Sequence, residues 1–501
     1  MPDYDVTVIG AGNAGLSAAT YLARKGIRTL LLEKHNIPGG CATSFCRGRF
    51  EFEVALHQLS GMGTTERPGP LRGILDGLGV LDQLEFVQME DLYRVVLTGE
   101  MDVTLPADKD ETVKILQKQF PSEKEGIRDY IDFVYKFFTE VIGAFYMNDP
   151  AISREKYPLY FKYALTDTQT VLDMFIKDPR IQMALSMYWT YMGLPPRLLS
   201  FSDMAALLFS YMEFKPFHIK GGSQALSNAL LNQFELHGGK SLFNTRVEKI
   251  LMQKDAVAGV VTESGEEITS RYVISNASAI STYVNMLGKE NTPDVLRKQM
   301  KGSTIGPSFF TIYAGFDAEP EELGINSETS FICASSDVER DFQQTKIRDV
   351  DNSSMIMSCY DVADPQFSPP GTSQAAIVTL KYAEPWLRVD PHRYADEKYR
   401  CAEILLKRAE KTYPGITSHI EEMEIATPVT HMRYLGHPGG GAYGFDQHVK
   451  DSNLFVSPKP PVKGLYCCGA WYDSGGFQPT LTSGTSSARA ILKEMRSGEV
   501  V

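Results

Sequence analysis

The chain has 501 residues, of which 43% are hydrophobic and 22% are charged, and this balance excludes the disordered and collagen-like classes in favour of a soluble globular protein. Acidic residues outnumber basic ones by 62 to 50 and the net charge is −12, so nucleic acid is not expected as a partner, because its phosphates require a basic face. The seven cysteines show no C-x-x-C spacing and the acidic N-terminus does not resemble a secretory signal, so we expect a reducing, cytoplasmic environment.

The first pattern along the chain is a strand, a glycine-rich turn, a helix and a second strand. Residues 6–9 form an apolar, β-branched run that leads directly into G-A-G-N-A-G at 10–15. Apolar residues then recur at helical spacing until Gly26, and a second apolar run at 29–32 ends in Glu33. This order is typical of a dinucleotide-binding unit.

Each part of this unit has a physical role. Gly10 allows the tight turn, Gly12 lets a pyrophosphate approach the backbone, and Gly15 lets the helix and strand pack closely. The helix N-terminus presents free N–H groups and a positive dipole end to phosphate. Glu33 is placed to accept hydrogen bonds from both ribose hydroxyls of an adenosine. A second match, at 439–444, has no strand before it and no apolar helix after it, and is interpreted as a loop.

Further elements follow from periodicity and turn signals. We expect a helix at 221–234, short strands at 241–243, 247–252, 256–262 and 272–275, a buried strand at 464–469, and a closing helix from about 480 to 495. The dinucleotide elements therefore lie at both chain ends and near residue 250, so both domains must be discontinuous in sequence.

The segment from about Leu92 to Phe214 differs from the rest because it is dense in Phe, Tyr, Trp and Met. One interpretation is an ordinary helical core. The other is a helical lobe that lines a long apolar tunnel. The two interpretations have equal weight at this point.

Four stretches carry a family resemblance. They are residues 5–33, then P-G-G-C-A-T-S-F at 38–45 with R-F-E-F-E at 49–53, then the segments 219–222, 238–239 and 244–247, and finally residues 464–481. Through them the chain resembles the flavin-dependent amine-oxidase-like superfamily, specifically its phytoene desaturase, carotenoid isomerase and retinol saturase branch. The resemblance implies an α/β fold, in which a Rossmann-type FAD-binding domain of the glutathione-reductase-like flavoprotein fold is joined to a discontinuous mixed α+β substrate domain with a helical lobe. The FAD-binding domain is expected at 1–90, 215–290 and 420–501, and the substrate-binding domain at 91–214 and 291–419.

The same resemblance implies FAD as the cofactor and assigns the residues that bind it. The main chain of Val247 is expected beside the adenine, and the N-terminus of the closing helix beside the pyrimidine edge of the flavin, where the helix dipole stabilises negative charge. The family often has Asp after Gly469, where this chain has Ala470, so the ribityl contact of that Asp is not predicted here. The expected cofactor-binding residues are Gly10, Gly12, Asn13, Ala14, Gly15, Glu33, Lys34, Gly39, Gly40, Cys41, Val247, Gly469, Ala470, Gln478, Thr480 and Leu481.

The activity implied by the resemblance is hydride chemistry at a C=C or CH–CH bond of a long apolar isoprenoid or polyene lipid, as in a saturase or desaturase. Three alternatives stay open: a redox-neutral cis–trans isomerase that uses reduced FAD, a flavin amine oxidase, and a non-enzymatic prenyl-binding escort protein. The intact glycine fingerprint and Glu33 disfavour the escort protein. With no second well-placed fingerprint, the electron partner is expected to be diffusible, a quinone or NAD(P)H.

Few polar residues stand out as catalytic. The candidate is His57, in the stretch after the diglycine segment that passes near the flavin in this family. It can donate a proton to the carbon that receives no hydride, since the pKa of histidine lies near working pH, and a structural bond to backbone or cofactor is the alternative. Tyr443 and Trp471 resemble family positions that flank the flavin or the tunnel, and packing is favoured for both.

Other chemistries have little support. The histidine and cysteine spacings predict no metal site and no catalytic dithiol. Peripheral contact with a membrane is left open because the expected substrate dissolves in lipid. The aromatic segment 188–217 is the candidate surface, to be tested at Tyr211 and Phe214.

Overall fold

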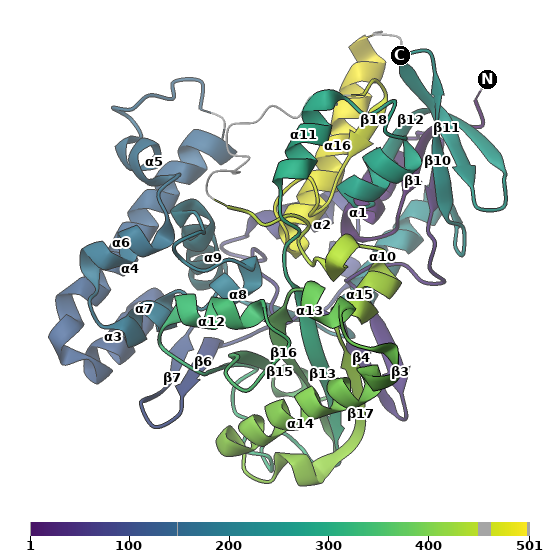
Figure 1. Cartoon of the computed structure of the whole chain (residues 1–501). Coiled ribbons are helices and arrows are strands. Elements are labelled where there is room, and N and C mark those ends of the chain that lie inside the picture. Colours follow the sequence, from purple (N-terminus) through teal and green to yellow (C-terminus); the bar gives the residue numbers. More distant parts are fainter. Residues whose placement is uncertain (1, 148, 449–461, 498–501) are drawn as a thin grey trace.

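The structure is a computed structural model that describes residues 2–147, 149–448 and 462–497. Two seven-stranded sheets lie in different parts of the molecule, and a lobe of helices lies beside them (Figure 1). Within the described residues, no helix is long and apolar enough to cross a bilayer.

The first sheet joins strands from both ends of the chain with strands near residue 250. Its order is β10-β11-β12-β1-β2-β9, and β18 pairs with β12. The strands β18, β12, β1, β2 and β9 run parallel, while β10 and β11 extend the sheet in antiparallel fashion. This confirms the predicted Rossmann-type arrangement. The strands are β1 (Tyr4–Ile9), β2 (Thr29–Leu32), β9 (Lys240–Leu242), β10 (Val247–Gln253), β11 (Ala256–Thr262), β12 (Glu267–Ser275) and β18 (Leu465–Cys467).

Three helices pack together on this sheet. The helix α1 (Asn13–Ala23) contacts both α10 (Gly222–Leu236) and α16 (Phe477–Ser497), and Figure 1 shows α16 alongside α1. A Cβ on Gly484 would lie 2.0 Å from the carbonyl oxygen of Ala14, so only glycine fits where α16 crosses α1. The predicted closing helix is confirmed, although it begins three residues earlier than expected.

The second sheet is almost entirely antiparallel. Its order is β17-β13-β16-β15-β14-β6-β7, and only β14 and β6 are parallel. The strand β17, which begins at the expected domain boundary near residue 420, pairs with β13 in this sheet. The strands are β6 (Asp91–Leu97), β7 (Met101–Pro106), β13 (Ser308–Phe316), β14 (Thr329–Cys333), β15 (Met355–Cys359), β16 (Ser373–Lys381) and β17 (Ile420–Ala426).

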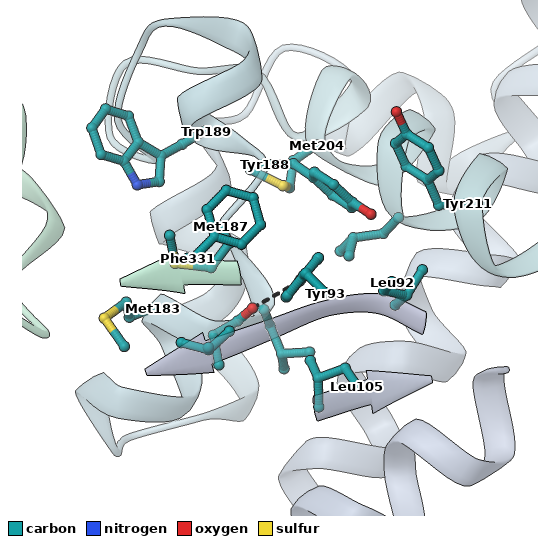
Figure 2. Packing of buried hydrophobic residues seen from close by; sticks show 14 of the residues in the cluster. Leu92, Tyr93, Leu105, Met183, Met187, Tyr188, Trp189, Met204, Tyr211 and Phe331 are labelled. Atoms are coloured by element: carbon teal, nitrogen blue, oxygen red, sulfur yellow. Dashed lines mark hydrogen bonds between the residues drawn. The ribbon is translucent and has the colours of Figure 1, made fainter. Parts of the chain in front are cut away.

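The helical lobe begins only after β7, because residues 91–106 form strands of the second sheet. Its aromatic residues pack mainly against one another. Tyr93 meets Tyr188 edge to face with ring centroids 5.0 Å apart, and the Tyr93 hydroxyl donates to the carbonyl of Ala184 at 2.8 Å (Figure 2). Much of the aromatic segment is therefore ordinary core. The lobe helices are α3 (Lys109–Gln119), α4 (Lys124–Val141), α5 (Pro158–Tyr163), α6 (Thr168–Phe175), α7 (Pro179–Leu185), α8 (Trp189–Met192) and α9 (Phe201–Phe214).

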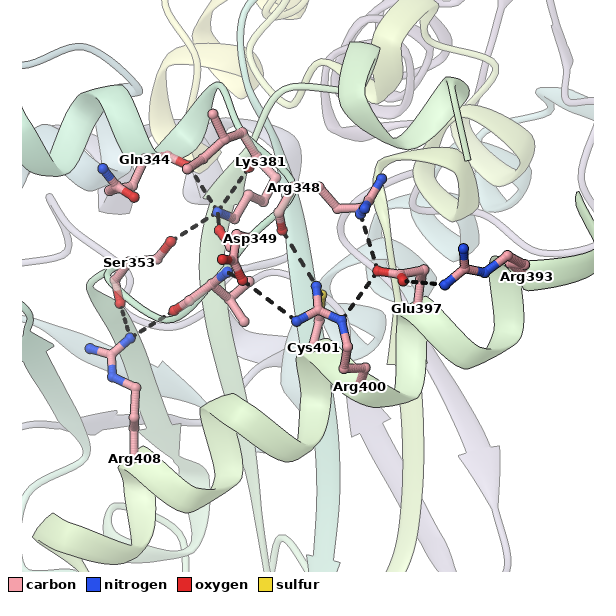
Figure 3. Close-up of polar contacts among 12 residues, drawn as sticks. Gln344, Arg348, Asp349, Ser353, Lys381, Arg393, Glu397, Arg400, Cys401 and Arg408 are labelled. Carbon is pink, nitrogen blue, oxygen red and sulfur yellow. Dashed lines mark hydrogen bonds and ion pairs between the residues drawn. The ribbon is translucent and has the colours of Figure 1, made fainter. Parts of the chain in front are cut away.

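A buried ammonium group ties the end of β16 to the loop before β15. Lys381 is fully buried, and its Nζ donates to the carbonyls of Gln344, Ile347 and Asp349 at 2.8, 3.1 and 2.5 Å and to Ser353 Oγ at 2.9 Å (Figure 3). These acceptors compensate for the burial of the charge.

The remaining α-helices are α2 (Pro70–Leu78), α11 (Asp294–Gly302), α12 (Val338–Thr345), α13 (Glu384–Leu387), α14 (Tyr394–Thr412) and α15 (Pro428–Leu435). The remaining strands form two pairs, β3 (Ser44–Arg47) with β4 (Phe50–Glu53) and β5 (Phe86–Gln88) with β8 (Phe217–Ile219).

Candidate active site

A cavity of about 1580 Å³ lies where the parallel strands of the first sheet end. Gly10 follows β1, Glu33 follows β2, Asn276 follows β12, and Gly469 lies just after β18; all four line the cavity. The carboxyl ends of parallel strands are the usual ligand edge of such sheets. The fold thus gathers at one place residues that are far apart in sequence.

Most of the predicted cofactor-binding residues line this cavity. Two do not. Gly15 lies beneath the turn, where a Cβ would be 1.9 Å from the carbonyl oxygen of Gly10, and Leu481 is buried between α16 and α1, its carbonyl accepting from Ser17 Oγ at 3.0 Å. Both support the wall from behind. The predicted residues in the wall are Gly10, Gly12, Asn13, Ala14, Glu33, Lys34, Gly39, Gly40, Cys41, Val247, Gly469, Ala470, Gln478 and Thr480.

The carboxylate of Glu33 is held in place by backbone amides. Its Oε2 accepts from Ala11 N at 2.7 Å and its Oε1 accepts from His35 N at 2.8 Å. Each carboxylate oxygen has two lone-pair sites, so both keep accepting capacity toward the cavity. A fixed anion with free lone pairs suits a pair of vicinal hydroxyls.

Sequence reasoning missed Asn276. Its backbone N–H donates to the carbonyl of Ile9 at 2.9 Å, and its side chain lies against the glycine turn, since a Cβ on Gly12 would be 2.8 Å from its Nδ2. The available signal was its position directly after a predicted parallel strand, because that is where ligand-edge residues occur.

The wall also contains polar groups that need a ligand. Asn13 Oδ1, His431 Nε2 and Trp471 Nε1 are buried and have no hydrogen-bond partner within the described residues, and all three residues line the cavity. The helix α1 has no side-chain cap and no acidic residue in its first turn, so its N–H groups stay available to phosphate. Glycines, a carboxylate, an uncapped helix and unpaired polar atoms together fit a dinucleotide.

The opposite part of the cavity is apolar. The lobe contributes Phe138, Tyr146 and Met147 from α4 and the turn after it, together with side chains of α8 and α9. Part of the lobe therefore lines the cavity while the rest forms core. Tyr443 and Trp471 also line the cavity, and a Cβ on Gly475 would lie 2.2 Å from the Tyr443 ring, which places Tyr443 against the loop before α16.

His57 lies on the wall of the same cavity. The segment that carries it reaches both parts of the site: the His57 ring centroid is 6.5 Å from that of Tyr191 in α8, and Gly61 packs on Gln478 of α16. Burial lowers the pKa of His57 to about 4, so the ring is neutral at pH 7. The expectation that its pKa lies near working pH is wrong, because the burial of the ring could not be seen in the sequence.

The fold and the cavity can now be compared with known proteins. Residues 13–492 match the family described as flavin containing amine oxidoreductase. The chain belongs to this family. Its cofactor is FAD, and the predicted fold class and cofactor are confirmed. The residues that would hold the adenosine and the diphosphate of bound FAD are those at the ends of β1, β2 and β12 and at the N-terminus of α1, all of which line the cavity.

The chain is also similar to known relatives, and two solved structures share its fold. It is 26% identical to all-trans-retinol 13,14-reductase of Danio rerio, in a match that covers 98% of this chain and 86% of that protein. It is 27% identical to prolycopene isomerase 2 of an Oncidium hybrid cultivar, covering 98% and 84%. Cyclohexylamine oxidase from Brevibacterium oxydans superposes with a TM-score of 0.65 at 15% identity, covering 99% and 100% of the two chains. RAB GDI from Plasmodium falciparum superposes with a TM-score of 0.54 at 13% identity, and the match covers 98% of each chain. Because an amine oxidase and a GDI share the fold, the fold alone does not distinguish a polyene-modifying enzyme from an amine oxidase or a non-enzymatic escort protein.

Proposed function

We propose that this flavoprotein adds or removes hydrogen across a C=C or CH–CH bond of a long apolar isoprenoid or polyene lipid, as a saturase or desaturase. The observation that carries the proposal is the cavity of about 1580 Å³ that joins the dinucleotide edge to an apolar end. A pocket for one drug-sized ligand measures about 300–1,000 Å³, so this volume leaves room for FAD and a second, long ligand. The relatives named for retinol and prolycopene match nearly the whole chain and support this substrate class.

The apolar end suits a hydrocarbon better than an amine. Burial of each CH₂ is favourable by about 0.8 kcal/mol, so a polyene needs apolar walls rather than polar anchors. The carboxylates of the lining are Glu33, Glu248 and Glu424, and none of them comes from the helical lobe. A protonated amine at the lobe end would therefore lack a counter-charge, which disfavours the amine oxidase alternative.

We propose His57 as the donor of the proton. Bound FAD exchanges a hydride with the substrate, and reduction of a C=C bond also needs a proton on the neighbouring carbon. His57 lies in the segment that touches both the lobe and α16. Since burial keeps the ring neutral, the proton that passes to the carbon comes from a neutral N–H, and the ring regains a proton from solvent in the same catalytic cycle.

Anaerobic stopped-flow spectroscopy tests the function. Reduced protein is mixed with all-trans-retinol or prolycopene, and the flavin absorbance is followed together with the products. Reoxidation of the flavin at the rate of product formation supports the saturase. Product formed with an unchanged flavin spectrum supports the isomerase instead. Hydrogen peroxide released with amine substrates supports the amine oxidase, and a colourless protein that takes up no FAD supports the escort protein.

We propose a diffusible electron partner, a quinone or NAD(P)H. The other glycine match, at 439–444, follows the helix α15 and not a strand, and no helix begins in the described residues 445–448 after it, so it lacks the strand that a second dinucleotide unit needs. Steady-state turnover with a quinone as electron acceptor and, separately, with NAD(P)H as electron donor distinguishes the two. Flavin reduction by NAD(P)H in the absence of any quinone favours the nicotinamide.

We also propose that the mouth of the apolar end touches a lipid bilayer. The predicted contact surface at 188–217 is wrong in one respect, because Tyr211 is buried with 4% exposure. The two most exposed large apolar residues in the described part of the lobe are instead Tyr146 and Met147, which are 60% and 73% exposed and also line the cavity. A lipid-dissolved substrate that enters there passes from membrane to tunnel without crossing water.

Liposome flotation tests this contact. Tyr146→Asp combined with Met147→Asp should reduce the fraction of protein that floats with vesicles. Leu236→Asp is the matched control, because Leu236 is 74% exposed but ends α10, on the cofactor side of the molecule. Equal flotation of the double variant and the control would contradict the proposed contact.

A further inference from the structure

A partly buried hydrogen bond links His57 to a tyrosine from a distant part of the chain. His57 Nδ1 lies 3.1 Å from the hydroxyl oxygen of Tyr360. The two rings are nearly parallel, at 10°, with centroids 6.4 Å apart. Tyr360 begins the single turn that follows β15, so the second sheet supplies a side chain to the segment that follows β4.

The position of His57 is itself fixed by a buried carboxylate. Glu53 Oε1 accepts from Ala55 N at 3.1 Å and from Leu56 N at 3.0 Å, while Oε2 accepts from Ser223 N at 2.7 Å. The loop that carries His57 is thereby anchored to the start of α10. Its ring has a defined place in which to meet Tyr360.

The direction of the hydrogen bond follows from the donors present. Burial raises the pKa of Tyr360 well above its usual value, so its hydroxyl keeps its proton. Among the described residues, Nδ1 of His57 is the one acceptor within hydrogen-bond distance of that hydroxyl. A neutral imidazole has one accepting and one donating nitrogen, and a buried O–H without an acceptor is costly. The hydroxyl therefore donates to Nδ1, and the ring proton resides on Nε2.

We propose that Tyr360 is a positioning residue that holds His57 as the Nε2–H tautomer, so that the ring presents a donor to the cavity. Within the described residues Nε2 has no hydrogen-bond partner, and His57 lines the cavity. A phenol in this position differs from the carboxylate that backs many catalytic histidines, since a carboxylate also stabilises the imidazolium. The use of this donor in catalysis rests on the proposed function, whereas the tautomer itself does not.

The groups around the pair do not supply a charge that would protonate His57. The titratable rings that face the pair are Tyr191 from α8, with its centroid 6.5 Å from that of His57, and His218 from β8, with its centroid 6.1 Å from that of Tyr360. Burial lowers the pKa of His218 to about 4, against a smaller opposing effect of Asp364. The other titratable groups that act on Tyr360 are Glu53, Tyr313 and Cys359. Burial raises the pKa of each of them, and that of Cys359 lies well above its usual value. The groups that donate to Glu53 oppose this effect of burial and favour its charged form, and burial is the cause of the lowered pKa of His57.

The experiment is a long-range ¹H–¹⁵N correlation on FAD-loaded protein labelled at histidine, with His57→Gln to assign the His57 signals. The expected spectrum shows an unprotonated Nδ1 and a protonated Nε2 from pH 5.5 to pH 8. In Tyr360→Phe, which keeps the ring and its packing, the Nδ1 signal should shift toward a protonated form. The control is Tyr130→Phe, because the Tyr130 hydroxyl is buried without a partner in the described part of the chain, and it should leave the His57 signals unchanged.

The wild-type spectrum decides even if a variant fails to fold. A protonated Nδ1, or an imidazolium at pH 6, overturns the role of Tyr360, as does an unchanged His57 spectrum in a folded Tyr360→Phe protein. With all-trans-retinol as the probe, Tyr360→Phe should lower kcat about a hundredfold with little change in KM; a raised KM at constant kcat also overturns the role. If the protein shows the expected tautomer but converts no polyene, the proposed function is overturned and the tautomer assignment is not affected.

Discussion

Replacement of Glu33 by Gln should weaken FAD binding and spare FMN binding. The carboxylate accepts from Ala11 N and His35 N and keeps lone pairs for the adenosine ribose. Glutamine has the same shape, but its NH₂ group faces one of the two backbone donors and cannot accept from a hydroxyl. Loss of a hydrogen bond to a charged group costs about 1.5–3 kcal/mol, which corresponds to an affinity for FAD lower by about 10- to 100-fold.

The assay is titration of apoprotein with each flavin, followed by the quenching of flavin fluorescence. FMN carries the same ring and ribityl phosphate but no adenosine, so it serves as an internal control for any general damage to the cavity. Equal weakening of FAD and FMN would point to distortion rather than to a lost ribose contact. Unchanged affinity for FAD would refute the assignment of Glu33 to the ribose.

Two further predictions concern stability. Lys381→Met removes the donor from three buried carbonyls and from Ser353, and at about 1 kcal/mol for each lost bond the free energy of unfolding should fall by about 3–4 kcal/mol. Chemical denaturation measures this change, and the control is Lys407→Met, which removes an exposed ion pair with Glu403 and should cost less than about 0.5 kcal/mol. Equal losses of stability in the two variants would contradict the account. The pKa of His218 is lowered to about 4, below the value of about 6.5 in an unfolded chain, so the unfolded state takes up the proton first as the pH falls. The contribution of His218 is complete above pH 6.5 and should decrease by about 2 kcal/mol between pH 7 and pH 5. His218→Phe should lose that part of the acid sensitivity in denaturant titrations at the two pH values, and an identical pH dependence in both proteins would contradict it.

Local patterns predicted the cofactor side of the molecule well. The strand at 6–9, the glycine turn and the strand at 29–32 lie next to one another in sequence, and the turn chemistry of Gly10 and Gly12 is decided within a few residues. The structure puts them where the pattern predicts. By contrast, the pairing of β17 with β13 depends on a partner about a hundred residues away, which no local signal reveals.

The catalytic side was predicted less completely for the same reason. His57 was found through a motif, but its neutral state follows from burial by the whole fold, and its partner Tyr360 is 303 positions away in sequence. Asn276 follows a predicted strand, yet its contact with Gly12 appears only when β12 and β1 are aligned in parallel. The aromatic segment could not be divided into core and tunnel wall, because both uses select the same residue types.

The most direct test of the central claim is the visible spectrum of the flavin during titration of the oxidised, FAD-loaded protein with a polyene such as all-trans-retinol. If cofactor and substrate share one cavity, the protein carries one flavin per chain and its absorbance bands shift with a saturable dependence on polyene concentration. A protein that takes up no flavin, or one that binds the polyene with no change in the flavin bands, would contradict the account.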